Sequence, residues 1–183
     1  MIEVLSAFPE GFLALCEYHD AILRGPSPLS IAERELIATY VSGLNQCDFC
    51  YGAHQAYAEA HGMDAEAFEK LIADPASAGI DEKLLPLLAY VKKLTLSPAN
   101  VTASDAAAVY AAGWNEQALF HAISVTGIFN LMNRLVEGTG ITANVMMRDA
   151  SRKRIEGDLE NATPYADFAR TVIARSKETA SAE

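Results

Sequence analysis

The sequence predicts an all-α protein of about eight helices. Alanine, the residue that most favours helix, occurs 32 times among the 183 residues. No segment alternates polar and apolar side chains with the period of two that is typical of strands, and no Asn-Gly or Asp-Gly pair marks a hairpin turn. Apolar residues instead recur at helical spacing between capping and turn residues. No low-complexity linker interrupts the chain, so we expect a single domain over residues 1–183.

Residues 1–28 are expected to form one N-terminal helix, from Pro9 to Leu23. Its apolar side chains recur at three- and four-residue intervals, and Cys16 lies among them. A free thiol on such a face packs as a small hydrophobic group, so we expect Cys16 to be a core residue. The Gly-Pro-Ser-Pro run at 25–28 ends the helix.

Residues 29–63 are expected to form a core pair of helices separated by a tight turn. Ser30 and Glu33 have the spacing of a capping box, which marks the start of the first helix. Asn45 and Gln46 occupy the turn, and Gly62 is the residue type that commonly follows a helix end in left-handed conformation. The two helices are therefore expected at about 31–44 and about 47–61.

Residues 64–140 are expected to form a second helical half, and residues 141–183 a C-terminal extension. Asp64, Thr102 and Asn115 are residue types that cap helix N-termini. Turn residues between them set the ends, which gives helices at about 65–73, 81–96, 102–113 and 116–137, with a last one from Pro164 to about Lys177. The longest of these helices carries Asn130 and Asn133 among apolar residues, and we expect them to hydrogen-bond to another helix.

The charge and the cysteine count exclude several classes of function. The net charge is −10 and the sequence pI is about 4.8, so phosphate backbones are repelled and no nucleic-acid partner is expected. No membrane association is expected either, since no apolar segment is long enough to span a bilayer and no export signal is recognised. Three cysteines do not fit a secreted disulfide scaffold, so a cytoplasmic location is expected.

Two thiols and an imidazole are predicted to share one face of the helix at 47–61. At 100° per residue, Cys47, Cys50 and His54 lie at about 0°, 300° and 340° around the helix axis. Near a helix N-terminus the helix dipole and the unpaired N–H groups favour a thiolate. An imidazole one turn away can accept or shuttle its proton.

Glu35 lies on the preceding helix, nearly as far from the turn as His54. The two residues are about 15 Å and about 13.5 Å of axial rise from it, so in an antiparallel pair their side chains come almost level. A carboxylate–imidazole–thiol relay, with the second thiol as resolving partner, is one interpretation. Glu33 lies about 200° around the helix from Glu35 and is assigned to the cap.

Structural zinc and a pair of inert core cysteines are the alternative interpretations. Zinc in structural sites takes four ligands, and the motif supplies three. His61 does not easily become the fourth, because it lies roughly 10.5 Å further along the same helix than His54. Free cysteines are among the most buried residue types, so a purely structural pair also stays open.

The pattern Glu-x11-Cys-x-x-Cys-x3-His resembles the alkylhydroperoxidase D (AhpD) core of the carboxymuconolactone decarboxylase superfamily. Residues 111–114 (Ala-Ala-Gly-Trp) and 129–134 (Phe-Asn-Leu-Met-Asn-Arg) resemble its peroxidase-related branch. The resemblance covers residues from about Leu29 to Gly140. One position departs from the pattern, since Phe49 stands between the cysteines where the best-studied members have a histidine.

The resemblance implies an AhpD-like all-α fold, homo-oligomers, and thiol-dependent reduction of alkyl hydroperoxides by an oxidoreductase. It assigns Cys50 as the peroxidatic thiol, Cys47 as the resolving thiol, and His54 with Glu35 as the proton relay. An external dithiol or lipoyl group would be the reductant, with no bound cofactor or metal. Two other functions are considered: a lactone decarboxylase or isomerase, whose family members generally lack the cysteine pair, and a non-enzymatic, redox-responsive oligomer.

Overall fold

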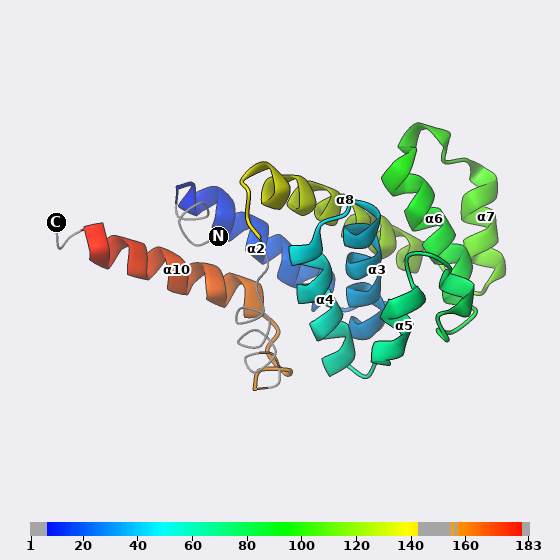
Figure 1. Ribbon diagram of the computed structural model, residues 1–183, viewed down its shortest axis with the longest axis horizontal. Coiled ribbons are helices and arrows are strands. Elements are labelled where there is room, and N and C mark those ends of the chain that lie inside the picture. Colours follow the sequence, from blue (N-terminus) through cyan, green and yellow to red (C-terminus); the bar gives the residue numbers. More distant parts are fainter. Residues whose placement is uncertain (1–6, 143–154, 156, 181–183) are drawn as a thin grey trace. The chain divides into compact units, whose positions relative to one another are not determined.

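The computed structural model describes residues 7–142, 155 and 157–180 of the chain (Figure 1). Within these ranges the regular elements are all helical, which confirms the all-α class. None of the helices described there is long and apolar enough to cross a membrane. The α-helices are α2 (Pro9–Leu23), α3 (Ile31–Leu44), α4 (Asp48–Ala60), α5 (Ala65–Lys70), α6 (Leu84–Leu96), α7 (Ala103–Ala111), α8 (Glu116–Gly138) and α10 (Pro164–Ala180), with 3-10 turns η1 (Pro75–Ser77) and η2 (Pro98–Asn100).

The chain divides into two compact units. The smaller unit comprises residues 1–26 and 160–183 and contains α2 and α10, and the larger unit comprises residues 27–159 and contains α3 to α8. Part of the expected C-terminal extension, residues 143–154, 156 and 181–183, lies outside the described residues. The expectation of one domain over residues 1–183 stays a prediction.

α3 is the central helix of the larger unit. It packs against α4, α6 and α8, and its residues 34–42 are all buried, so it is covered around its whole circumference. Leu36, Ile37 and Val41 are completely buried, and burial of each such side chain stabilises the fold by about 1.5–3 kcal/mol. α4 runs back along α3 after a short turn (Figure 1). The helix pair expected within residues 29–63 is therefore confirmed.

Helix starts follow the capping residues that the sequence indicates. The Ser30 hydroxyl accepts the Glu33 N–H at 3.2 Å, and the Glu33 carboxylate accepts the Ser30 N–H at 2.6 Å. The Asn115 side chain accepts the Ala118 N–H at 2.8 Å at the start of α8. A cap of this kind is typically worth about 1 kcal/mol, so these short local signals fix where α3 and α8 begin.

The start of α6 differs from the expectation. α6 begins at Leu84 and not at about 81, because Asp81 first forms a tight turn. The Asp81 carboxylate accepts the Lys83 N–H at 2.9 Å, and its carbonyl accepts the Leu84 N–H at 2.9 Å. Pro86 then stands in the first turn of α6, where its missing N–H costs no helical hydrogen bond.

The same backbone motif ends four helices, namely α3, α4, α7 and α8. In α3 the residue with positive φ in this motif is not a glycine. Beyond the ends of the other three helices stand glycines with positive φ: Gly62 at 97°, Gly113 at 91° and Gly140 at 69°. In α3 this place is taken by Gln46 with φ 58°, the one non-glycine residue with positive φ in the described part of the chain. The Gln46 N–H donates to the Gly43 carbonyl at 3.1 Å. The Cys47 N–H donates to the Ser42 carbonyl at 2.9 Å, which completes a Schellman motif.

The smaller unit is a pair of packed helices. Phe12 and Cys16 of α2 form one apolar cluster with Ala169 and Val172 of α10, and Phe168 lies edge-on to Phe12 with ring centroids 6.4 Å apart. Cys16 is buried, which confirms it as a core residue. This burial, together with nearby acidic groups, raises the pKa of the Cys16 thiol to about 12, so it is protonated at neutral pH.

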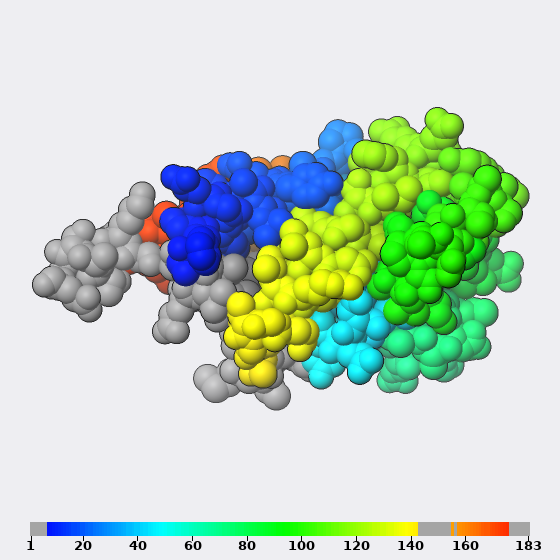
Figure 2. Space-filling view, turned by 90° about the horizontal axis from the view of Figure 1, so that it is seen from above, coloured from blue at the N-terminus to red at the C-terminus, as the bar shows by residue number. Residues whose placement is uncertain are grey.

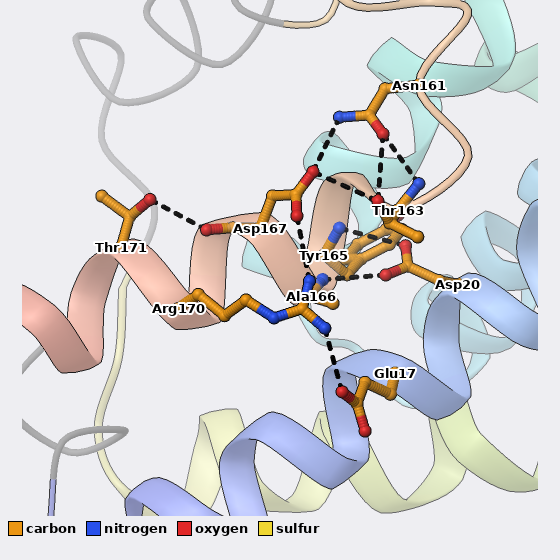
Figure 3. Close-up of polar contacts among 9 residues, drawn as sticks. All are labelled: Glu17, Asp20, Asn161, Thr163, Tyr165, Ala166, Asp167, Arg170 and Thr171. Atoms are coloured by element: carbon orange, nitrogen blue, oxygen red, sulfur yellow. Dashed lines mark hydrogen bonds and ion pairs between the residues drawn. The ribbon is translucent and has the colours of Figure 1, made fainter.

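Asp20 of α2 caps the start of α10 (Figure 3). Its two carboxylate oxygens accept the backbone N–H groups of Tyr165 and Ala166 at 3.0 and 2.8 Å. The unpaired N–H groups of a helix start are usually capped by a neighbour in sequence, whereas here the acceptor comes from another helix. Asp20 is only 5% exposed, and this burial raises the pKa of its carboxyl group although the two N–H donors oppose the change.

We expect Gln46→Gly to stabilise the protein by about 0.5–1 kcal/mol, because glycine adopts left-handed angles without the steric cost of a β-carbon. The free energy of unfolding in urea measures the effect. Gly62→Ala is the matched control, since a β-carbon there meets no atom within 4 Å and only the backbone conformation is penalised. The free energy of unfolding of the Gly62→Ala variant should be lower by about 1 kcal/mol. A Gln46→Gly protein less stable than the wild type would contradict the assignment of strain to this turn.

Asp20→Ala should loosen the first turn of α10, because two buried N–H groups lose their acceptor at a cost of about 1–3 kcal/mol. Amide hydrogen exchange at Tyr165 and Ala166 reports this loss directly. Glu17→Ala is the control: it removes only an ion pair with Arg170 in which both side chains are about half exposed, typically worth less than about 1 kcal/mol. Unchanged exchange at Tyr165 and Ala166 in the Asp20 variant would show that this carboxylate does not hold the helix start.

Candidate active site

The turn between α3 and α4 positions both cysteines of the Cys-x-x-Cys motif. Cys47 completes the Schellman motif of α3 and is at the same time the N-cap residue of α4. It has extended backbone angles, so α4 begins at Asp48, one residue later than the sequence predicts. Cys50 is the third residue of α4, and His54 lies one turn further along the helix. One short turn thus fixes the backbone positions of both thiols.

The two thiols are buried next to each other where α4 meets α8. Cys47 is completely buried and Cys50 is 4% exposed, and both cluster with Val136 of α8. Phe49 and Ile141 pack against the same cluster. Figure 2 shows the C-terminal part of α8, in yellow, at the surface beside α4, in cyan. The surroundings of the thiols are therefore largely apolar.

A hydrogen bond between the two thiols makes them differ in acidity. Donation from Cys47 is the main influence that lowers the pKa of Cys50, to about 7, and burial opposes it. The attraction of His54 and a hydrogen bond from Asn133 lower this pKa further, whereas the charge of Glu137 raises it. The pKa of Cys47 is raised by its hydrogen bond to Cys50 and by burial. Cys50 is therefore the thiol of the pair that ionises near neutral pH.

His54 meets Glu35 across the helix pair. Its Nδ1 atom lies 2.6 Å from Oε2 of Glu35, and Glu35 is completely buried. The two side chains are level, as the spacing predicts, and Glu33 takes the capping role assigned to it. With Nδ1–H donating to the carboxylate, Nε2 is the ring nitrogen left to exchange a proton. The imidazole packs edge-on against Phe129 of α8, with ring centroids 4.3 Å apart.

α8 supplies polar groups that the sequence analysis did not assign to the site. Asn133 accepts from Asn45 at 2.9 Å and donates to Ser42 at 3.1 Å. Asn45 also donates to Asn130 at 3.2 Å, so the interhelical bonds expected for both α8 asparagines are confirmed. The particular partners of Asn133 carry no signal in the sequence, because helical spacing does not tell which turn of α8 faces the turn between α3 and α4.

The zinc interpretation requires several His, Cys, Asp or Glu side chains that gather around one point. In the described ranges, no three His, Cys, Asp or Glu side chains gather in a group that could hold a metal ion. His61 is the C-cap residue of α4, at the opposite end of the helix from the thiols. The expectation that the protein binds no metal stays a prediction.

The sequence matches the model of the carboxymuconolactone decarboxylase family over residues 9–93, a segment that contains Glu35, both cysteines of the motif and His54. None of the curated proteins matches the chain. Three solved structures have the same fold. A peroxidase-related protein from Silicibacter sp. TM1040 is 29% identical with a TM-score of 0.69, and the match covers 74% of this chain and 71% of that one.

The second structure is the alkylhydroperoxidase AhpD core of a peroxidase-related protein from Ralstonia eutropha JMP134. It is 25% identical with a TM-score of 0.75, over 81% of this chain and 78% of that one. The third structure is a putative antioxidant defence protein AhpD from Agrobacterium tumefaciens. It is 20% identical with a TM-score of 0.68, over 77% of this chain and 95% of that one. This likeness shows the fold alone. The chain has the AhpD-like fold. Over residues 9–93 it is similar to the carboxymuconolactone decarboxylase family, and its fold is that of the AhpD-like proteins.

Glu35→Gln should raise the pKa of Cys50 by about one unit, because the carboxylate holds in place the imidazole whose attraction lowers this pKa. The pH dependence of Cys50 alkylation, located by mass spectrometry, measures this pKa. If Glu35 and His54 act as one unit, the pKa of Cys50 in the Glu35→Gln/His54→Ala double variant should be little higher than in the single variant with the larger shift.

Glu33→Gln is the matched control for this prediction. It alters the cap of α3, should lower stability by about 1 kcal/mol or less, and should leave the alkylation profile unchanged. Effects of the two site substitutions that simply multiply would show that Glu35 and His54 do not form one relay. A shifted profile in Glu33→Gln would reverse the assignment of the two carboxylates.

Proposed function

We propose that the protein is a thiol-dependent hydroperoxidase that uses the Cys47–Cys50 pair, with His54 and Glu35 as a proton relay. One observation carries the proposal: a thiol whose pKa is lowered to about 7 lies beside a second thiol and under the influence of an imidazole held by a buried carboxylate. This is the combination that peroxide reduction needs, namely a nucleophilic sulfur, a resolving sulfur and a proton source. The names of the related structures support the same reaction class.

In the first step, the Cys50 thiolate attacks the terminal oxygen of the hydroperoxide. The O–O bond breaks, Cys50 is oxidised to the sulfenic acid, and the departing alkoxide takes a proton and leaves as the alcohol. We assign this proton to Nε2 of His54, because Nδ1 is held against Glu35. The apolar side chains around the pair, Val136, Phe49 and Ile141, favour an alkyl hydroperoxide over a strongly polar one.

In the second step, the Cys47 sulfur attacks the Cys50 sulfur. The S–O bond breaks, water leaves, and a disulfide joins the two cysteines. An external dithiol, either a protein or a lipoyl group, then supplies two electrons and two protons through a mixed disulfide and restores both thiols. The overall reaction converts a hydroperoxide and a dithiol into an alcohol, water and a disulfide. It needs no bound cofactor, and it suits a reducing cytoplasm, the location we propose.

We also propose that the protein works as a homo-oligomer. Phe120, Leu131 and Leu135 of α8 are 65%, 47% and 44% exposed, so this helix presents large apolar side chains that a second copy could cover.

The family also contains decarboxylases, but decarboxylation or isomerisation of a lactone does not use a dithiol. The buried pair of thiols with unequal acidity therefore favours peroxide reduction over these reactions.

One equivalent of cumene hydroperoxide added to the reduced protein should give a Cys47–Cys50 disulfide, while Cys16 stays reduced. Mass spectrometry of alkylated peptides measures all three thiols. Cys47→Ser should stop at a Cys50 sulfenic acid that dimedone traps, and Cys50→Ser should not react. Because the thiolate is the nucleophile, the rate should rise about tenfold per pH unit below a pKa of about 7 and level off above it.

Cys16→Ala is the matched control for the loss of a thiol and should react like the wild type. Full reactivity of Cys50→Ser would reverse the roles of the two thiols. Thiols that stay reduced with hydrogen peroxide and with several alkyl hydroperoxides would rule out the peroxidase and favour the decarboxylase interpretation. A disulfide that forms without turnover by dithiols, but changes the oligomer size, would favour the redox-responsive oligomer.

A further inference from the structure

The thiol pair is almost closed to solvent. Cys47 is completely buried and Cys50 is 4% exposed. A hydroperoxide oxygen, an alkylating reagent or the sulfur of an external dithiol must touch a sulfur atom of the pair before it can react. Some of the atoms around the two thiols must therefore move aside each time the pair reacts, and the side chains packed there differ in how easily they can do so.

Three apolar side chains pack at the thiol pair, and they are not held equally firmly. Val136 is buried within α8, and Phe49 belongs to the first turn of α4. Ile141 is partly buried and lies beyond Gly138, the last residue of α8. A displacement of Val136 or Phe49 would disturb a helix, whereas Ile141 can move without breaking one.

Ile141 is held at the pair by the backbone motif that ends α8. The Gly140 N–H donates to the Glu137 carbonyl at 3.1 Å, and the Ile141 N–H donates to the Val136 carbonyl at 3.2 Å. These are the two bonds of a Schellman motif, which folds the residue after the left-handed glycine back onto the last turn of the helix. Gly140 has φ 69°, and a β-carbon there meets no atom of the described residues within 4 Å. Two hydrogen bonds and one glycine conformation thus set the place of Ile141.

We infer that Ile141 controls access to the thiol pair: the pair is closed while the Schellman motif of α8 is formed, and it opens when this end of the helix unwinds at Gly140. The size of side chain 141 then determines which molecules enter. Such a local opening costs much less than unfolding of the whole unit, because only the end of one helix is released. The inference rests on the proposed function where it concerns hydroperoxides, but access to the thiols is independent of the substrate.

The experiment measures how fast Cys50 reacts with a small reagent, iodoacetamide, and with a bulky one, N-phenylmaleimide. Mass spectrometry locates the label, and circular dichroism checks that each variant is folded. Rates are taken at about pH 9, above the Cys50 pKa of about 7, so that ionisation of the thiol does not limit them. Each variant is compared with the wild type by the two rates and by their ratio.

Ile141→Ala shortens the covering side chain. It should accelerate both reagents, and the bulky one by about tenfold more than the small one, because discrimination by size depends on single methylene groups. Ile80→Ala is the matched control, since Ile80 is also partly buried and lies outside the helices. It should leave both rates unchanged. A folded Ile141→Ala protein that is less stable but reacts with both reagents like the wild type would give Ile141 a structural role only and overturn the inference.

Gly140→Ala tests the opening without changing the covering side chain. Alanine adopts left-handed angles at a steric cost, so the open form should become about five- to tenfold more frequent. Both reagents should accelerate by this factor with their ratio unchanged, because the same opening admits both. Gly62→Ala is the matched control, since Gly62 also has positive φ but lies beyond the far end of α4. Equal acceleration in the two glycine variants would reflect a general loss of stability and overturn the inference.

These readouts separate the inference from the proposed function. Alkylation needs no peroxide, so faster labelling in Ile141→Ala and Gly140→Ala supports the access role even if the wild type does not reduce hydroperoxides. Conversely, a wild type that turns over peroxide, together with unchanged labelling of both variants, would leave the proposed function standing and remove Ile141 from it. If Ile141→Ala does not fold, Gly140→Ala against Gly62→Ala decides the question by itself.

Discussion

A carboxylate buried without water needs a partner, and this need organises the centre of the larger unit. Glu35 lies on a helix that is covered on every side, and it is completely buried. Its partner His54 comes from the next helix, at 2.6 Å. Sliding α4 along α3 by one turn, about 5.4 Å, would break this contact and take the imidazole away from a buried carboxylate, which is destabilising. The pair therefore fixes the register of the two helices, and with it the place of the cysteines at their turn.

The acidity of the site comes from donors rather than from exposure to solvent. Burial alone disfavours a thiolate, as the raised pKa of Cys16 in its apolar cluster illustrates. Cys50 is buried as well, yet its pKa is lowered, chiefly because Cys47 donates to its sulfur and also because His54 attracts its charge. Such a site keeps water away from the sulfur while it favours the charged form.

Local signals in the sequence were sufficient for the helices and for four of the site residues. Ser30 and Asn115 cap their helices through bonds to residues three positions away, and the i, i+3, i+7 spacing of the motif brings two thiols and an imidazole to the same end of α4. Features formed by distant residues were out of reach. Asn133 donates to Ser42, and Asp20 caps α10, through packing that neither spacing nor residue type encodes. Gln46 shows the same limit, because nothing in a glutamine side chain favours left-handed backbone angles.

The cap that Asp20 provides to α10 has a consequence for the order of events during synthesis. The two helices of the smaller unit stand at opposite ends of the chain, and the whole larger unit is translated between them. At the usual speed of translation, α2 waits on the order of ten seconds before α10 leaves the ribosome. Throughout this time the apolar face with Phe12 and Cys16 lacks its partner helix. Until α10 is made, this face of α2 stays exposed and prone to aggregation, so it is a surface for a chaperone to cover.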